Sequence, residues 1–339
     1  ENRFALHGKL LLLADSGRIE EALRIARSCD FLEAGELEAM EVEMHLAASM
    51  PQMAVPIVDD LIAERSNEVA TWMIAGRVRM SNGDLPGARK AYLRALEIEP
   101  DNRMVMEKLA PILVADISTW DDAGAVLEVV GDSNPVLAEI LELTMSASDR
   151  STGSFRPSKD HLNRSLELVD RFPGAIAPSR LAWQLHEAAG RHDIGLEIGT
   201  NAMSRFQNGA EPALWAYQSA LGAGDWDRAV DFAYAARSRS ERNRSLLHDL
   251  RIADLCMRLG RNGEAYAALA PYEGMLGNDS ELVGRMTMSD RSTVGEVTLI
   301  RRLRGLSISA LIRTRRIDKA KALLVSLIAD NPGLLEAWI

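Results

Sequence analysis

The chain has 339 residues and a formal net charge of −10, which argues against general nucleic-acid binding. No apolar run approaches the roughly 20 residues of a membrane-spanning helix, so we expect no membrane insertion. Ala, Leu, Arg and Glu dominate while aromatic residues make up 5%, a composition that favours helix. No signal-peptide pattern follows Glu1, so we expect a cytoplasmic protein, with the periplasm as the alternative if a signal peptide precedes Glu1.

Residues 69–102 carry two apolar stripes at helical spacing, separated by turn residues at 82–84. The stripes consist of Trp72, Ala75, Gly76, Ala88, Tyr92, Ala95 and Pro100. Two stripes with a turn between them predict an antiparallel helical hairpin. Gly76 and Ala88 are small where the helices should cross most closely, and Tyr92 is expected to fill the wider gap one turn further along.

This stretch resembles the tetratricopeptide repeat, whose pattern is W-x2-L-G-x2-Y, then A-x3-F, then P. It departs from the pattern at Ala75, where Leu is usual, and at Arg79, where Tyr is usual. A single hairpin of this kind cannot bury its apolar face alone, so we expect the neighbouring segments to be further repeats.

Aligning the rest of the chain on the turn and the small residue that follows it supports this expectation. The predicted hairpins span 3–34, 36–66, 69–102, 104–135, 136–173, 176–209, 210–243, 246–275 and 294–329. We therefore predict an all-α, right-handed superhelical solenoid of about nine antiparallel hairpins. The sixth hairpin is the weakest assignment, because Gly195 and Gly199 lie inside its second helix.

The sequence predicts one solenoid domain over 1–339, with sub-blocks 1–146 and 158–339. The intervening loop, 147–157, is rich in Ser, Gly, Asp and Pro and interrupts the fifth hairpin. We interpret it as an exposed loop and a hinge.

A second insertion is predicted at 277–293. Residues 335–338, with Trp338 in the place of Trp72, resemble the start of one more repeat that is truncated at Ile339. We therefore expect further repeats, or another domain, to follow.

No pattern for catalysis, a cofactor or a metal occurs in the sequence: it has no P-loop, no G-x-G-x-x-G, no G-x-S-x-G and no H-E-x-x-H. Cys29 and Cys256 are interpreted as small core residues. The six histidines are interpreted as surface or capping residues, and they are His7, His45, His161, His186, His192 and His248. We expect a protein that is not an enzyme.

The family resemblance implies that the first helix of each hairpin lines a concave groove in which a partner peptide, helix or domain lies. Carried over by position, this face would include Glu43, Met73, Arg77, Met80, Lys108, Arg180, Gln184, Gln218, Asp254, Arg258 and Arg302, with His7 in the first hairpin. Large polar residues at such positions have no expected packing duty, which makes them candidates for partner contacts.

Charge is spread unevenly, with 17 basic against 10 acidic residues between 237 and 321. This distribution predicts an acidic partner near an Arg-rich patch, which comprises Arg301, Arg302, Arg304, Arg313, Arg315 and Arg316.

The resemblance implies a protein-binding scaffold. Three alternatives stay open: the helical arm of a larger bacterial enzyme such as a glycosyltransferase or sulfotransferase, the periplasmic scaffold of a polysaccharide secretion system, and a self-associating module.

Overall fold

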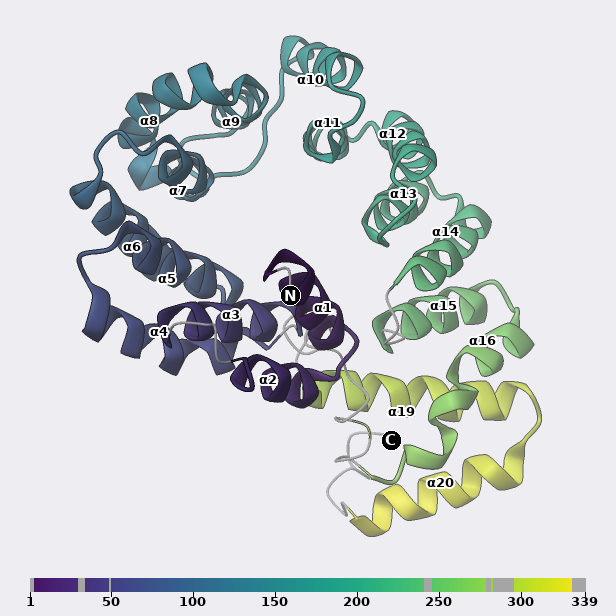
Figure 1. Ribbon diagram of the computed structural model, residues 1–339. Helices are drawn as coiled ribbons and strands as arrows, with labels where there is room; N and C mark the ends of the chain where they lie inside the picture. Colours follow the sequence, from purple (N-terminus) through teal and green to yellow (C-terminus); the bar gives the residue numbers. More distant parts are fainter. Residues whose placement is uncertain are drawn as a thin grey trace. The chain divides into compact units, whose positions relative to one another are not determined.

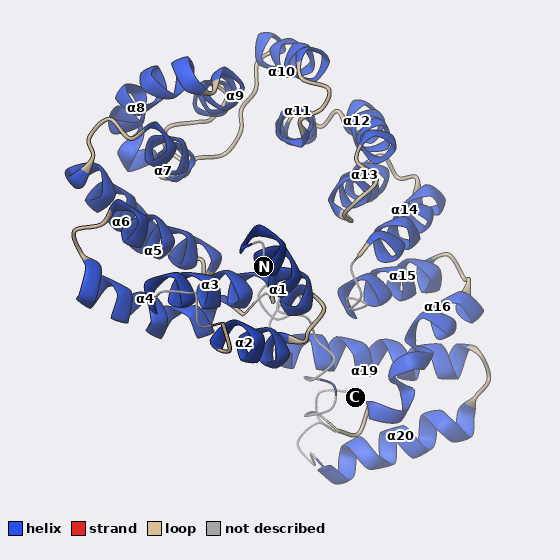
Figure 2. Cartoon of the chain, in the orientation of Figure 1, coloured by secondary structure: helices blue, strands red, loops and turns tan. Residues whose placement is uncertain are grey.

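The computed structural model describes residues 3–29, 34–48, 50–240, 246–278, 282 and 296–330. Regular structure in these ranges is helical, apart from an isolated bridge between Ser148 and Phe155 (Figure 2). The predicted all-α repeat fold is confirmed. Within the same ranges, no helix combines the length and apolar character that crossing a membrane requires.

The chain divides into two compact units, Glu1–His161 and Leu162–Ile339. The division falls within the first turn of the helix that follows the predicted loop 147–157. Most of the predicted insertion 277–293 and the repeat start at 335–338 lie outside the described residues.

Unit 1 consists of successive helical hairpins. Its helices are α1 (Arg3–Asp15), α2 (Ile19–Arg27), α3 (Ala34–Ala47), α4 (Pro51–Arg65), α5 (Val69–Ser81), α6 (Leu85–Ile98), α7 (Arg103–Ala115), the 3₁₀ turn η1 (Ile117–Thr119), α8 (Trp120–Ser133) and α9 (Pro135–Ser146). Each second helix packs against its own first helix and against the first helix of the next hairpin, and first helices also contact one another, as α1 with α3 and α3 with α5. In Figure 1, α1, α3 and α5 accordingly lie on one side of unit 1.

Unit 2 repeats the arrangement. Its helices are α10 (Lys159–Arg171), α11 (Ile176–Ala188), α12 (His192–Arg205), α13 (Glu211–Gly222), α14 (Trp226–Arg239), α15 (Leu246–Arg258), α16 (Asn262–Leu269), the 3₁₀ segment η2 (Ala270–Met275), α19 (Glu296–Arg313) and α20 (Ile317–Asp330). The first helices α11, α13 and α15 lie on one side and the second helices α12, α14 and α16 on the other (Figure 1).

Six of the turns inside the hairpins use a left-handed residue to reverse the chain. Five of them place glycine there, at Gly17, Gly83, Gly190, Gly224 and Gly260, with φ between 71° and 79°. Glycine reaches this conformation without steric cost. The α19–α20 turn places Arg315 there instead, at φ 61°, and Arg315 is the non-glycine residue with positive φ among those described.

The signature hairpin α5–α6 closes differently from the sequence expectation. A Cβ atom on Gly76 would lie 2.5 Å from the ring of Tyr92, and Tyr92 is fully buried. Tyr92 therefore fills the space directly over Gly76, and the expectation that it fills a separate, wider gap was wrong. The glycine is needed because the aromatic ring occupies the place of its side chain.

Packing also explains the two glycines inside α12, although their low helix propensity had argued against a helix at these residues. A Cβ atom on Gly199 would lie 2.7 Å from the backbone nitrogen of Ala216 in α13, and one on Gly195 would lie 2.3 Å from the Glu187 carboxylate. Helices α12 and α13 thus approach one another more closely than a side chain at position 199 would allow. The hairpin judged weakest from its sequence thus makes a close contact with the hairpin that follows it.

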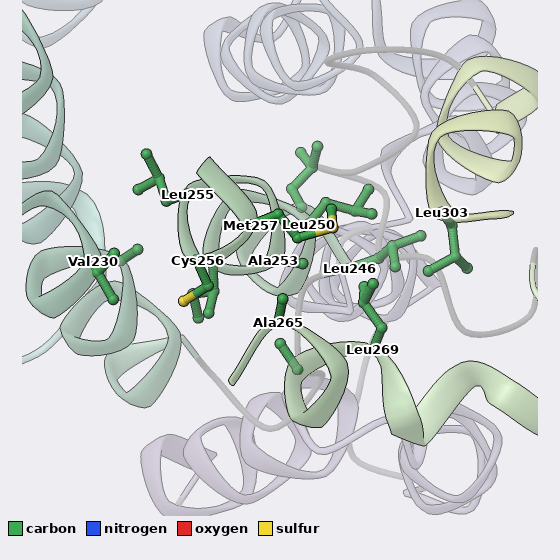
Figure 3. Close-up of a cluster of buried hydrophobic side chains, with 14 of the residues drawn as sticks. Val230, Leu246, Leu250, Ala253, Leu255, Cys256, Met257, Ala265, Leu269 and Leu303 are labelled. Atoms are coloured by element: carbon green, nitrogen blue, oxygen red, sulfur yellow. The ribbon is translucent and has the colours of Figure 1, made fainter. Parts of the chain in front are cut away.

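The core of unit 2 is built around α15. Leu250, Ala253 and Cys256 on this helix are fully or almost fully buried against Val230 of α14 and Ala265 of α16 (Figure 3). Burial raises the pKa of the Cys256 thiol to about 11, as expected of a small core residue.

Three histidines are buried, so their interpretation as surface or capping residues was wrong. The exposed fraction is 1% for His186, 5% for His248 and 9% for His45. Burial lowers the pKa of His186, and the charge of Arg191 lowers it further. The capping interpretation fits His161, whose backbone N–H donates to the Ser158 hydroxyl while its Nδ1 accepts from the Ser158 N–H.

We predict that Gly199→Ala destabilises the protein by about 1–3 kcal/mol, because the backbone of Ala216 cannot yield to a Cβ atom. The matched control is Gly8→Ala in α1, where a Cβ atom meets nothing within 4 Å. There the better helix former should stabilise by about 0.5–1 kcal/mol. Urea unfolding followed by circular dichroism measures the free energy of unfolding of both variants. A change of the same sign in the two variants would contradict the close approach of α12 and α13.

We also predict that His186→Leu reduces the loss of stability on acidification. Because the pKa of His186 is lowered in the folded protein, the unfolded chain binds the proton more readily. The resulting stability is present above the ordinary histidine pKa of 6.5 and is lost as the pH falls below it. Melting temperatures at pH 7.5 and 5.5 should therefore differ less in His186→Leu than in wild type, while the control His161→Gln should keep the wild-type difference.

Candidate partner-binding face

The first helices of unit 1 are joined by an ion pair between two of the predicted site residues. Arg77 on α5 donates from both terminal nitrogens to the Glu43 carboxylate on α3, at 2.5 and 2.6 Å. The bidentate geometry fixes both side chains. Of the other predicted residues in this unit, Met73 is half-buried, while Met80 and Lys108 are exposed.

The same kind of link occurs in unit 2. Arg180 on α11 donates to both carboxylate oxygens of Glu211, the first residue of α13, at 2.6 and 2.8 Å. On the same two helices, Gln184 is half-buried and Gln218 is exposed. The sequence interpretation included Arg180 and missed Glu211.

Beneath these polar side chains, α11 and α13 are held together by aromatic and hydrogen-bonded contacts. The rings of Trp183 and Trp215 stack with centroids 5.7 Å apart. The Trp183 indole donates to the Ser219 hydroxyl, which donates to the Glu187 carboxylate. The position of Arg180 and Glu211 is thus set by a packed layer below them.

A third polar cluster on the first helices joins α15 and α19. Arg258 and Arg302 both approach the same oxygen of Asp254, with nitrogen–oxygen distances of 3.2 and 3.8 Å. Two guanidinium groups therefore share one carboxylate. Arg258 also lies over the ring of Trp226, 5.7 Å from its centroid, and 38% of Trp226 is exposed.

Tyr217 on α13 borders this cluster. The Arg251 guanidinium lies 5.9 Å from the centre of the Tyr217 ring. Burial raises the pKa of Tyr217, whereas the charges of Arg251, Arg302 and Arg258 oppose the shift. We call the surface formed by Tyr217, Trp226, Asp254, Arg258 and Arg302 the α15 cluster.

These contacts correct one premise of the sequence interpretation. Glu43, Arg77, Arg180, Asp254 and Arg302 do have a structural duty, because each pairs with a residue on a neighbouring first helix. The spacing of 34 residues between Glu43 and Arg77 is one repeat length, and complementary charges one repeat apart are the signal that could have revealed this pair.

The Arg-rich patch predicted near the end of the described chain is largely engaged in holding helices together. Arg304 donates to the Leu276 carbonyl, Arg313 to the Met257 carbonyl and Arg316 to the Tyr266 hydroxyl. Arg302 belongs to the α15 cluster, and Arg301 is exposed. Among the described side chains, no group of three or more His, Cys, Asp or Glu residues could hold a metal ion.

The sequence matches no protein-family model and no curated protein. Among solved structures, a tetratricopeptide repeat protein from Parabacteroides merdae aligns over 75% of this chain and 98% of its own, with a TM-score of 0.55 and 12% identity. The type IV pilus biogenesis factor PilW gives a TM-score of 0.45 at 15% identity, over 62% of this chain and 96% of its own. The structure of a human IFIT1 dimer with m7Gppp-AAAA gives a TM-score of 0.49 at 11% identity, over 95% of this chain and 80% of its own.

The described hairpins define a helical repeat protein, built from two layers of antiparallel helices in each unit. More narrowly, the glycine turns, the packing of each second helix on the next first helix, and the similarity to the Parabacteroides merdae structure give the chain a tetratricopeptide-type repeat fold. At 12% identity this similarity concerns the fold alone.

We predict that the link between Glu43 and Arg77 stabilises unit 1. A double-mutant cycle with Glu43→Gln and Arg77→Gln should give a coupling of about 0.5–1 kcal/mol, because both side chains are partly exposed. The control is the pair Arg94 and Glu97, which lies within the single helix α6. Its coupling should be smaller, about 0.3 kcal/mol. Urea unfolding midpoints measure both cycles, and a coupling between Glu43 and Arg77 no larger than the control's would contradict a bracing role.

Proposed function

We propose that this chain is a non-enzymatic scaffold that binds another protein at the α15 cluster of unit 2, where the first helices α13, α15 and α19 meet the start of the second helix α14. The observation that supports this most directly is the α15 cluster, in which Arg258 and Arg302 share the single carboxylate of Asp254. Among the described residues these two guanidinium groups share that one carboxylate, and an acidic side chain of a partner would supply a second. Arginine pairs well with carboxylates because its planar fork donates two parallel hydrogen bonds.

The aromatic side chain beside the two arginines supports a protein partner. Trp226 is partly exposed although it is large and apolar, and Arg258 covers one part of its ring. Trp, Tyr and Arg are the residues that most often carry the binding energy of protein interfaces. A partner segment with an acidic residue next to an apolar one would contact both parts of the cluster.

The proposal places the remaining first-helix residues in supporting roles. Gln184 and Gln218 present amide groups that accept and donate hydrogen bonds on the same side of unit 2. Arg180 and Glu211 already neutralise one another within the chain. Their pair would therefore contribute to binding through the shape and rigidity of the surface more than through attraction to a charged partner.

The test is a comparison of wild type with the double variant Arg258→Gln and Arg302→Gln. Proteins captured from a nuclease-treated lysate of the source organism are quantified by mass spectrometry, and a retained partner is then titrated against both chains. The double variant should bind at least about tenfold more weakly, because two charge-assisted contacts are lost. Wild-type affinity should also fall as salt is added.

The matched control is Arg205→Gln with Lys321→Gln, which removes the same charge from exposed positions on the second helices α12 and α20. This control should bind as wild type does. If both double variants lose the partner equally, binding depends on overall charge and the proposed face is wrong. Circular dichroism of all three chains must show equal helicity, so that a lost partner cannot reflect unfolding.

A further inference from the structure

A cleft of about 530 Å³ lies in unit 1, where α8, α9 and the loop after α9 meet. Trp120 and Leu127 of α8, which are 5% and 4% exposed, and the half-buried Met145 of α9 form the apolar part of its lining, and Glu142 and Arg150 contribute opposite charges. The volume lies within the usual range for small-ligand sites, which combine apolar walls with few polar groups. This cleft is separate from the α15 cluster, and the inference drawn from it does not depend on the proposed function.

The loop that forms one wall of the cleft is internally bonded, although its sequence suggested a hinge. The Asp149 N–H donates to the Ser154 carbonyl at 2.9 Å, and the Arg156 N–H donates to the Ala147 carbonyl at 2.7 Å. The Asp149 carboxylate accepts from the Ser151 hydroxyl and from the Ser151 N–H, and these two bonds lower its pKa. The loop thus has a defined internal structure and carries Arg150 beside α8.

Arg150 occupies a specific place on the ring of Trp120. Its guanidinium lies 5.6 Å from the ring centroid, the arrangement of a cation–π contact. The indole itself is held by its N–H, which donates to the Val114 carbonyl at 2.8 Å. Arg150 is held more weakly, since its ion pair among the described residues is with Asp121 at 4.0 Å and the two side chains are 74% and 96% exposed. Such a contact contributes little free energy.

The charges around this ring favour a cation. Glu142 lines the cleft and Asp121 adjoins it through Arg150, so two carboxylates accompany a single guanidinium. Gly124, also in the lining, leaves space beside the ring, because a Cβ atom there would meet nothing within 4 Å. An aromatic face flanked by carboxylates is a typical binding site for organic cations.

We propose that this cleft binds an alkylguanidinium or alkylammonium group, and that Arg150 is an internal competitor for the ring of Trp120. The cation of the ligand lies on the indole and pairs with Glu142, while its alkyl chain packs along Leu127 and Met145. The apparent affinity is reduced by the fraction of molecules in which Arg150 covers the ring. Removing Arg150 therefore strengthens binding, which is the opposite of the result expected at an anion site.

The experiment uses the full chain and two probes, agmatine and Nα-acetylarginine methylamide, titrated by calorimetry and by saturation-transfer NMR. We expect millimolar binding to wild type, roughly two- to fivefold tighter binding to Arg150→Ala, and weaker binding to Glu142→Gln. The control Arg94→Ala, on the exposed side of α6, should leave affinity unchanged. The neutral analogue Nα-acetylcitrulline methylamide should not bind.

The two probes also distinguish the source of the cation. Tighter binding of agmatine assigns the site to a free amine, and tighter binding of the peptide analogue assigns it to a basic side chain of a peptide. The proposal is overturned if Arg150→Ala abolishes binding, if benzoate binds in place of the cations, or if neither cation binds wild type or Arg150→Ala at millimolar concentration. Each variant retains Trp120, so the fold around the indole is preserved in every arm.

Discussion

Close contact between consecutive helices is the constraint on which the rest of this structure depends. A hairpin of this size leaves one apolar face open, and that face is covered only when the next hairpin packs against it. Gly76 under the ring of Tyr92 and Gly199 against the backbone of Ala216 show how little space is left at such contacts. Because the helices approach to this degree, the positions of their outward side chains are also fixed. The geometry of the surface that these side chains form is therefore set by the packing beneath it.

The same periodic packing explains why charged residues far apart in sequence meet. Glu43 and Arg77, Arg180 and Glu211, and Asp254 and Arg302 each join a first helix to the following first helix. Two of these links pair one arginine with one carboxylate, but Asp254 is shared by two arginines. The α15 cluster is thus a link between first helices in which two arginines share one carboxylate among the described residues.

Local sequence patterns were sufficient to predict the elements that depend on local chemistry. Glycine at a left-handed position and Asp84 capping α6 through the Gly87 N–H belong to single hairpins, and the order of helices followed from them. Patterns of this kind could not predict contacts between hairpins. The role of Gly199, the burial of His186 and the pair of Arg180 with Glu211 each require knowing which residue lies opposite on another helix. The hydrogen bonds inside the loop that carries Arg150 were not predicted, because its polar composition is equally typical of a mobile linker.

The turn between α19 and α20 differs from the glycine turns in a way that affects how the protein opens. Arg315 adopts the left-handed conformation that glycine adopts elsewhere, at a cost of about 1–2 kcal/mol for a residue with a Cβ atom. Because of this cost, the α19–α20 hairpin unfolds more easily than it would with glycine at position 315. In a linear array, fluctuations that begin at such a turn spread to the neighbouring hairpin only by breaking the next interface. An opening that begins at Arg315 therefore stays within α19 and α20 as long as α19 keeps its contacts with α15 and α16.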